Sequence, residues 1–279
     1  MFIFLLFLAI FCLVLFCITN KIKIKWRTFL KKGFKPARGI FGLYCYTGKQ
    51  GKGKTFSLAE YMFDKSEESV FFCNIAGITS CDYFFYTGFV ELLKLKDIID
   101  YKYKDDYDAC VLYARSLGFD LPRAEKLAGF IQDVIINEKQ LVFVYDEIFT
   151  ELMKGSKLDK RVMDFLCQMR KRKLIFLTTA QEWAEIPLTF RRFCRYQIDC
   201  CMIPILFTGI LIKRFNDAEN MKWSDEEQEH VAPLLETTIT HTRSEVANSY
   251  DTYLRVSSAI PQEIAERQNA NKEFLSTQE

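Results

Sequence analysis

Apolar runs alternate with mixed apolar and polar segments through the middle of the chain. Short runs rich in aromatic and β-branched residues are typical of buried strands, and longer segments with apolar residues three and four apart are typical of helices. Strands that alternate with helices favour a parallel sheet with crossover connections, so the predicted fold class is α/β. The predicted strands are Gly39–Thr47, Ser69–Ile75, Gln140–Tyr145 and Leu174–Thr178. The predicted helices are Phe56–Asp64, Phe89–Asp100, Asp159–Arg170, and Ala109–Ile136 with breaks at Gly118 and Pro122.

The pattern changes after Tyr196. The apolar run Met202–Ile212 is too short to cross a bilayer, and it contains Pro204 and Gly209. It predicts two strands with a turn near Thr208–Gly209, with a second membrane segment as the alternative. Asn216–Glu229 is acidic and predicts a loop, and Thr237–His241 and Tyr253–Val256 are candidate late strands. The polar tail from Ser257 is either a marginal helix or disordered.

The N-terminus is the most apolar part of the chain. Met1–Ile18 has no charged side chain, and at about 1.5 Å per residue a helix of this length nearly spans a bilayer core of about 30 Å. Basic residues follow the apolar run, whereas a cleaved signal peptide has its positive charge before it. We therefore expect an uncleaved, single-pass anchor whose basic flank keeps the rest of the chain in the cytoplasm. The alternative is a buried hydrophobic helix.

These boundaries give four segments. Residues 1–19 are the predicted transmembrane anchor, 20–38 a basic juxtamembrane segment that can also contact anionic lipid, 39–256 the catalytic domain and 257–279 the tail. The net charge of +2 excludes a basic nucleic-acid coat, so any nucleic-acid binding must use local patches. The ten cysteines form no C-x-x-C pair, which indicates reduced thiols and a cytosolic domain rather than a zinc or disulfide framework.

A glycine-rich loop follows the first predicted strand. Gly48–Thr55 reads G-K-Q-G-K-G-K-T and fits the P-loop pattern G-x-x-x-x-G-K-[ST] in full. Its position between a strand and a helix lets backbone N–H groups and the helix N-terminus face phosphate oxygens. We predict that Lys54 reaches the β- and γ-phosphates of ATP and that the Thr55 hydroxyl ligates Mg²⁺. The predicted nucleotide-binding residues are Gly48, Lys49, Gln50, Gly51, Lys52, Gly53, Lys54, Thr55 and Phe56. The alternative is a flexible basic loop.

Two acids follow the strand L-V-F-V-Y-D-E, Leu141–Glu147. This pattern resembles a Walker B motif, in which Asp146 serves Mg²⁺ and Glu147 activates the attacking water as a general base. Adjacent acids of this kind separate ATPases with an additional strand in the sheet from most kinases. An ordinary strand end with a solvated acidic turn is the alternative.

Polar residues after the next strand complete the predicted site. Gln181 ends L-I-F-L-T-T-A-Q, at the edge of the sheet where ligands bind, and it is a candidate to sense phosphate or orient water. The alternative is a helix cap at Thr178 or Thr179. Three arginines follow in T-F-R-R-F-C-R, and Arg192 is the candidate to act on a neighbouring subunit's nucleotide. The alternatives are Arg170–Lys173, which could instead contact nucleic acid, and a solvated face for both clusters.

The P-loop, the D-E strand, the T-T-A-Q strand and the nearby arginines stand in an order that resembles the zonula occludens toxin (Zot)-like family of filamentous-phage assembly ATPases, in the FtsK–HerA class. The resemblance covers about Gly39–Asp199, and Asn74 fits an asparagine often found after the second strand. It implies an oligomeric, membrane-bound motor, with a hexamer as one option, whose partners are phage coat or assembly proteins and single-stranded DNA.

One departure from the family concerns the anchor. Filamentous-phage members usually have the span after the ATPase domain, and here the predicted span comes first. The leading hypothesis is a motor for virion assembly and extrusion at the host membrane. A DNA-packaging or DNA-translocating ATPase is the alternative, followed by a membrane scaffold that uses ATP as a switch and by a small-molecule kinase.

Overall fold

The protein was analysed as a computed structural model, which describes residues 10–12, 14, 22–24, 41–148, 152, 159–205, 208–225 and 229–250. Within these described residues, the main sheet has nine strands in the order β1-β11-β8-β7-β2-β6-β5-β3-β4. From β7 to β4 all neighbours are parallel, and β8 pairs antiparallel with both β7 and β11. The strands are β1 Ile22–Ile24, β2 Gly42–Thr47, β3 Ser69–Cys73, β4 Tyr83–Phe85, β5 Gln140–Tyr145, β6 Ile175–Ala180, β7 Cys194–Ile205, β8 Thr208–Asp217 and β11 Leu234–His241.

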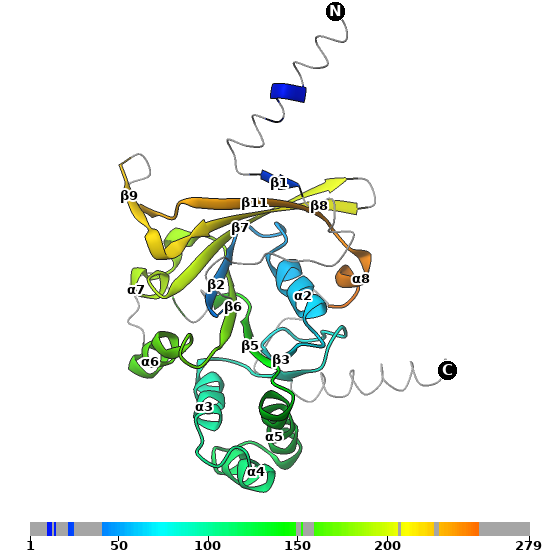
Figure 1. Ribbon diagram of the computed structural model, residues 1–279, viewed down its shortest axis with the longest axis vertical. Helices are drawn as coiled ribbons and strands as arrows, with labels where there is room; N and C mark the ends of the chain where they lie inside the picture. Colours follow the sequence, from blue (N-terminus) through cyan, green and yellow to red (C-terminus); the bar gives the residue numbers. More distant parts are fainter. Residues whose placement is uncertain are drawn as a thin grey trace, which may run out of the picture.

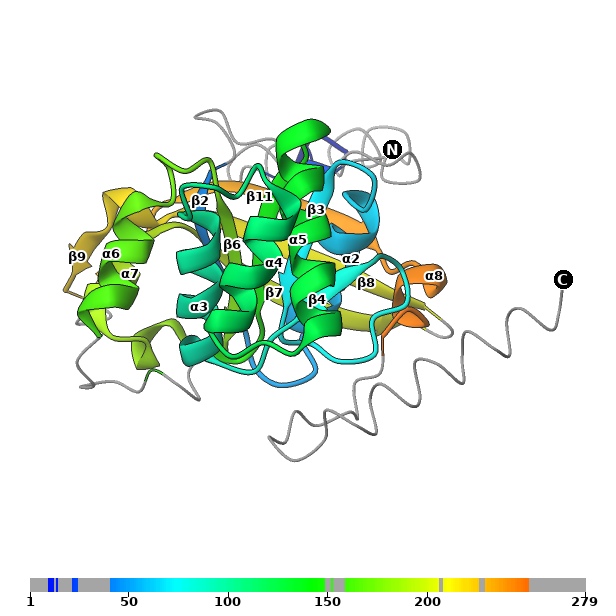
Figure 2. The same ribbon diagram turned by 90° about the horizontal axis from the view of Figure 1, so that it is seen from below.

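Helices cover both faces of the sheet (Figures 1 and 2). One face packs against α3 (Phe89–Ile99), α4 (Tyr107–Ser116), α5 (Leu121–Ile136), α6 (Lys160–Gln168) and α7 (Leu188–Arg191). The other face packs against α2 (Lys54–Asp64), and α8 (Ser244–Ala247) lies against α2 and β8. Short 3-10 helices, η3 Trp183–Glu185 and η4 Ala218–Asn220, connect the later elements. The predicted α/β class with a mostly parallel sheet is confirmed.

Local capping explains where several helices begin. Asp106 accepts a hydrogen bond from the backbone of Ala109 at the start of α4, and Asp120 accepts one from Arg123 at the start of α5. Such caps satisfy backbone donors that have no partner inside the helix. The expected break at Gly118 separates α4 from α5, but the expected break at Pro122 is wrong. Pro122 lies in the first turn of α5, where a helix needs no N–H donor.

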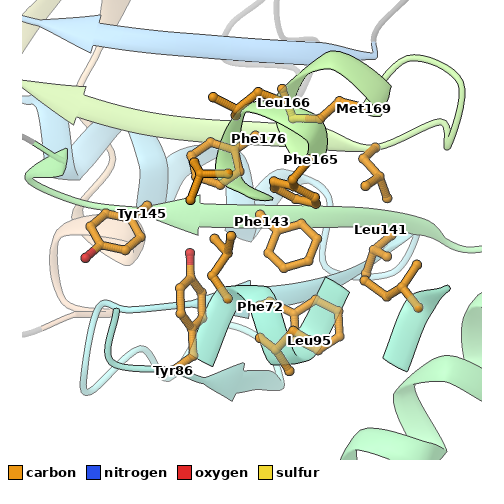
Figure 3. Packing of buried hydrophobic residues seen from close by; sticks show 14 of the residues in the cluster. Phe72, Tyr86, Leu95, Leu141, Phe143, Tyr145, Phe165, Leu166, Met169 and Phe176 are labelled. Carbon is orange, nitrogen blue, oxygen red and sulfur yellow. The ribbon is translucent and has the colours of Figure 1, made fainter. Parts of the chain in front are cut away.

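Aromatic residues fill the core under the middle of the sheet. Phe143 of β5 stacks on Phe72 of β3 with ring centroids 5.1 Å apart, and Phe165 of α6 meets it edge-on at 5.4 Å (Figure 3). β5 is buried on both faces, since Val142 and Val144 lie in the opposite cluster. A strand buried on both faces is held rigidly, so the residues that follow it have a fixed position.

The C-terminal part contains more strand than the sequence predicted. The antiparallel strands β7 and β8 confirm the interpretation of Met202–Ile212 as strands rather than a membrane segment. The expected loop Asn216–Glu229 is wrong in part, because β9 (Lys222–Ser224) pairs with β10 (Glu229–Val231) as a small two-stranded sheet. These strands are too short to show a period, which is why the pattern missed them.

Three predictions fall mainly beyond the described ranges. Most of the predicted anchor, Met1–Ile18, lies outside them, and so do Tyr253–Val256 and the tail from Ser257. Among the residues that the structure does describe, no helix combines the length and apolar character needed to cross a membrane.

Candidate functional site

The ends of four parallel strands bring the predicted site residues to one edge of the sheet. β2, β6 and β5 end at Thr47, Ala180 and Tyr145. Because these strands pair in register, the residues that follow them, Gly48, Gln181 and Asp146, lie along the same edge. β3 ends beside them, and Asn74 follows it. The site that the sequence predicted from separate motifs is therefore one location.

The glycine-rich loop fits tightly against the β7–β8 strand pair. Gly48 and Gly53 have φ angles of +142° and +85°, a region that favours glycine. A Cβ on Gly48 would lie 2.7 Å from the backbone oxygen of Cys200, and one on Gly53 would lie 2.8 Å from Cδ1 of Leu211. Both glycines are therefore required by the close approach of β7 and β8 as well as by the turn.

The Lys54 ammonium points back into the loop at the start of α2. Nζ donates to the backbone oxygens of Gly48 at 2.6 Å and Lys49 at 3.2 Å, and the side chain is buried. It therefore lies on the inner side of the loop, where the P-loop pattern requires it. Among the other predicted nucleotide contacts, Lys49 to Lys52 are exposed. The Phe56 side chain packs with Leu211 and Val246, which leaves only its backbone for a ligand.

Asp146 lies next to the end of the loop. The Thr55 hydroxyl donates to Oδ2 of Asp146 at 2.9 Å, and the Thr179 hydroxyl donates to Oδ1. Burial raises the pKa of Asp146, and the hydrogen bonds from Thr179 and Thr55 and the charge of Lys54 oppose that rise. The Thr55 hydroxyl and the Asp146 carboxylate thus converge as two oxygen donors beside the loop, as a Mg²⁺–nucleotide site requires.

The backbone of Asp146 is fixed from β3. Asn74 donates from Nδ2 to the Asp146 carbonyl oxygen at 3.1 Å, and its Oδ1 accepts from the Asp146 N–H at 2.6 Å. These two hydrogen bonds resemble those that one further residue of β3 would make with β5. The sequence indicated Asn74 only through the resemblance to the Zot-like family. In the structure, Asn74 fixes the backbone position of Asp146.

Glu147 has an unusual backbone conformation for its residue type. Its φ is +56°, and its N–H donates to Oγ1 of Thr179 at 2.7 Å. Desolvation raises the pKa of Glu147, the charge of Asp146 raises it further, and Lys54 lowers it. A left-handed residue that is not glycine or asparagine is uncommon and often marks a functional site.

The strand order decides the class of fold. β6, which carries Thr179 and is followed by Gln181, lies between the P-loop strand β2 and the acidic strand β5. This is the additional strand that the adjacent acids Asp146 and Glu147 predicted. The chain has the fold of a P-loop NTPase.

The chain is similar to several solved structures. The chain is similar to the N-terminal domain of zonular occludens toxin from Neisseria meningitidis, at 14% identity, with 76% of this chain and 100% of that domain covered and a TM-score of 0.43. It is also similar to the genome packaging NTPase B204 from Sulfolobus turreted icosahedral virus 2, crystallised with ATP-gammaS, at 11% identity, 72% and 97% coverage and a TM-score of 0.35. No protein-family model and no curated protein matches the chain. At these similarities the fold assignment rests on this chain's own strand order and loop.

Gln181 lies next to the first glycine of the loop. Its backbone oxygen accepts a hydrogen bond from the N–H of Gly48 at 3.1 Å, and the residue is half-buried. The structure therefore places Gln181 beside the start of the glycine-rich loop. Its role in sensing phosphate or orienting water remains a prediction.

Burial separates the three arginines of T-F-R-R-F-C-R. Arg191 and Arg195 are buried, with Arg191 over the Trp183 ring and Arg195 donating to the backbone oxygen of Phe41 at 2.8 Å. Arg192 is exposed. It lies between α7 and the start of β7, at the edge opposite the P-loop. Arg192 therefore lies at the other end of the strands from the P-loop of its own chain. Its contact with a neighbouring subunit remains a prediction.

The alternative cluster Arg170–Lys173 lies at the same edge as Arg192. The next residue, Leu174, accepts a hydrogen bond from the N–H of Gly42 at the start of β2. Arg170 forms an ion pair with Glu219, and Arg172 forms one with Asp100 at 2.7 Å. Two of its charges therefore have acidic partners within this chain.

Sequence reasoning missed a polar network beside the loop. The Thr47 hydroxyl donates to Oδ1 of Asp199, and Asn216 donates to Oδ2 at 2.7 Å. This network ties the last residue of β2 to β7 and β8. Asp199 and Asn216 also line a cavity of about 370 Å³, together with Trp183 and Arg214. The polar residue Asp199, which interrupts an apolar strand pattern, was the signal that could have indicated it.

Proposed function

We propose that this chain is an ATPase that hydrolyses ATP with Mg²⁺ at the P-loop. The observation that carries the proposal is the convergence of Thr55 and Asp146, 2.9 Å apart, at the start of the helix that follows the loop, with Glu147 as the next residue. Thr55 and Asp146 would hold a Mg²⁺ ion, which would supply positive charge against the phosphates.

The residues divide the chemistry among themselves. The N–H groups of the loop and the start of α2 bind the phosphates, and Lys54 exchanges its contacts with Gly48 and Lys49 for phosphate oxygens. Glu147 accepts a proton from the attacking water, and its raised pKa makes it a better base than an ordinary carboxylate. Gln181, beside Gly48, orients that water or detects the γ-phosphate.

We further propose that the ATPase is a membrane-anchored, oligomeric motor for filamentous-phage-type virion assembly and extrusion. The support is the order of motifs that resembles the Zot-like family, the apolar N-terminus with its basic flank, and the exposure of Arg192 for use by a neighbouring subunit. A DNA-packaging or DNA-translocating ATPase is the second candidate, favoured by an apolar run that precedes the ATPase domain instead of following it.

Two stimulation assays separate these candidates. We expect phosphate release by the full-length protein in lipid vesicles to increase when the vesicles also contain the phage coat protein, because an extrusion motor couples turnover to that cargo. A single-stranded DNA oligonucleotide should have a smaller effect. Stimulation by DNA alone would contradict extrusion and favour translocation, and slow hydrolysis under every condition would favour an ATP-dependent switch.

The anchor makes a separate prediction. Removing residues Met1–Asn20 should release the protein from washed membranes and leave ATP affinity unchanged, because the P-loop and the strands that support it begin after residue 40. Sedimentation with vesicles and equilibrium binding of ATP check the two parts. A truncated chain that still sediments with neutral vesicles would show that Met1–Asn20 is not the membrane anchor.

A further inference from the structure

One hydroxyl joins the two acidic residues of the site. Thr179 is fully buried on β6, and its Oγ1 accepts from the N–H of Glu147 at 2.7 Å while its proton goes to Oδ1 of Asp146. A threonine hydroxyl has one proton to donate, so donation to Asp146 leaves its lone pairs to accept from Glu147. Thr179 can therefore make both hydrogen bonds at once, and together they fix the orientation of its hydroxyl group.

The contact to Glu147 supports a strained backbone. At φ +56° Glu147 adopts a backbone conformation that residues other than glycine rarely take. Such conformations persist where the surrounding structure holds them. The backbone direction at this residue decides where its carboxylate points. A hydrogen bond to its N–H from the rigid strand β6 therefore acts on the position of the proposed base.

Asn74 and Thr55 also form hydrogen bonds with Asp146, at other atoms. Asn74 binds the backbone of Asp146, and Thr55 binds its second carboxylate oxygen. Thr178, the adjacent residue on β6, is equally buried, but its hydroxyl donates to the backbone oxygen of Tyr145 at 2.8 Å. Thr179 is thus the residue that links the two acids, and Thr178 is its matched control.

We propose that Thr179 is a positioning residue for hydrolysis, whose hydroxyl holds Asp146 and Glu147 in the arrangement that activates the attacking water. The inference rests on the proposed ATPase function and adds a residue to it. Thr179 does not touch the phosphates in this scheme. Its loss should therefore affect the rate of hydrolysis more than the binding of ATP.

The test compares Thr179→Val, Thr179→Ser and Thr178→Val in the full-length protein. We expect Thr179→Val to lower kcat by about 10–100-fold with KM for ATP within about threefold of the wild type, as for other residues that orient a reacting group. Thr179→Ser keeps the hydroxyl and should restore kcat to within about threefold. Thr178→Val loses a similar buried hydrogen bond and should keep the wild-type kcat.

Thermal unfolding separates this role from a structural one. Thr179→Val loses two hydrogen bonds, one of them to a carboxylate, and Thr178→Val loses one, so their stabilities should differ. The kcat values are therefore compared at a temperature at which thermal unfolding shows both variants to be folded, and a difference between them then reports on the acids. If Thr179→Val does not fold, Thr179→Ala replaces it. Equal kcat in Thr179→Val and wild type, or an equal loss in Thr178→Val, would overturn this inference alone. A wild-type protein that binds ATP without hydrolysing it would overturn the proposed ATPase function, and this inference with it.

Discussion

Glu147→Gln should bind ATP like the wild type and hydrolyse it about 10²–10⁴-fold more slowly, which is the usual effect of losing a positioned general base. The amide keeps the size and shape of the side chain and removes its ability to accept a proton. The backbone hydrogen bond to Thr179 does not involve the carboxylate, so the loop and the strand end should stay in place. ATP affinity by equilibrium binding and phosphate release measured on the same preparation check both halves.

Asp146→Asn is the matched companion to that variant. Its carboxylate receives hydroxyl donors from Thr55 and Thr179, and it is the proposed Mg²⁺ ligand. Its substitution should therefore weaken the binding of Mg–ATP itself, while Glu147→Gln should not. A Glu147→Gln protein that turns over at the wild-type rate would show that this carboxylate is not the base.

Lys54→Ala should lose measurable ATP binding and hydrolysis. Lys54 is buried on the inner side of the loop, held by backbone oxygens of Gly48 and Lys49. Charge-assisted hydrogen bonds to phosphate oxygens in such a site are among the strong ones, and alanine supplies none. Lys65→Ala is the control, since Lys65 follows the opposite end of the same helix, outside the predicted binding residues, and pairs with Glu68. It should retain binding and turnover.

The sequence was sufficient for the parts of the site that are local in the chain. The loop, its strand and its helix are contiguous, so the glycine spacing and the flanking apolar run predicted all three. The strand before Asp146 was also predictable, because a run that is apolar at every position indicates burial on both faces. The position of β6 between β2 and β5 followed only as an implication of the paired acids, and the structure confirms it.

Contacts between distant residues could not be read in the same way. The Thr179–Asp146 hydrogen bond joins residues 33 positions apart, and the Thr47–Asp199 bond joins residues 152 apart. No spacing rule connects such pairs, because the chain path between them sets their geometry. The positive φ of Glu147 was equally hidden, since glutamate gives no local signal for a left-handed backbone.

Burial decided a question that charge alone left open. In T-F-R-R-F-C-R the three arginines have the same chemistry, but Arg191 and Arg195 are enclosed by aromatic rings and backbone oxygens while Arg192 faces solvent. Long side chains can bury their stems in a core, so residue type does not predict exposure. Arg192 is the arginine predicted to act on a neighbouring subunit, and its exposure leaves it accessible for that contact.

Steady-state release of phosphate from Mg–ATP by the full-length wild-type protein, Lys54→Ala and Lys65→Ala, each purified in the same way, tests the P-loop assignment most directly. We expect turnover in the wild type and in Lys65→Ala, and none above background in Lys54→Ala. Equal phosphate release by wild type and Lys54→Ala would contradict the assignment, because the activity would then come from somewhere other than the loop Gly48–Thr55.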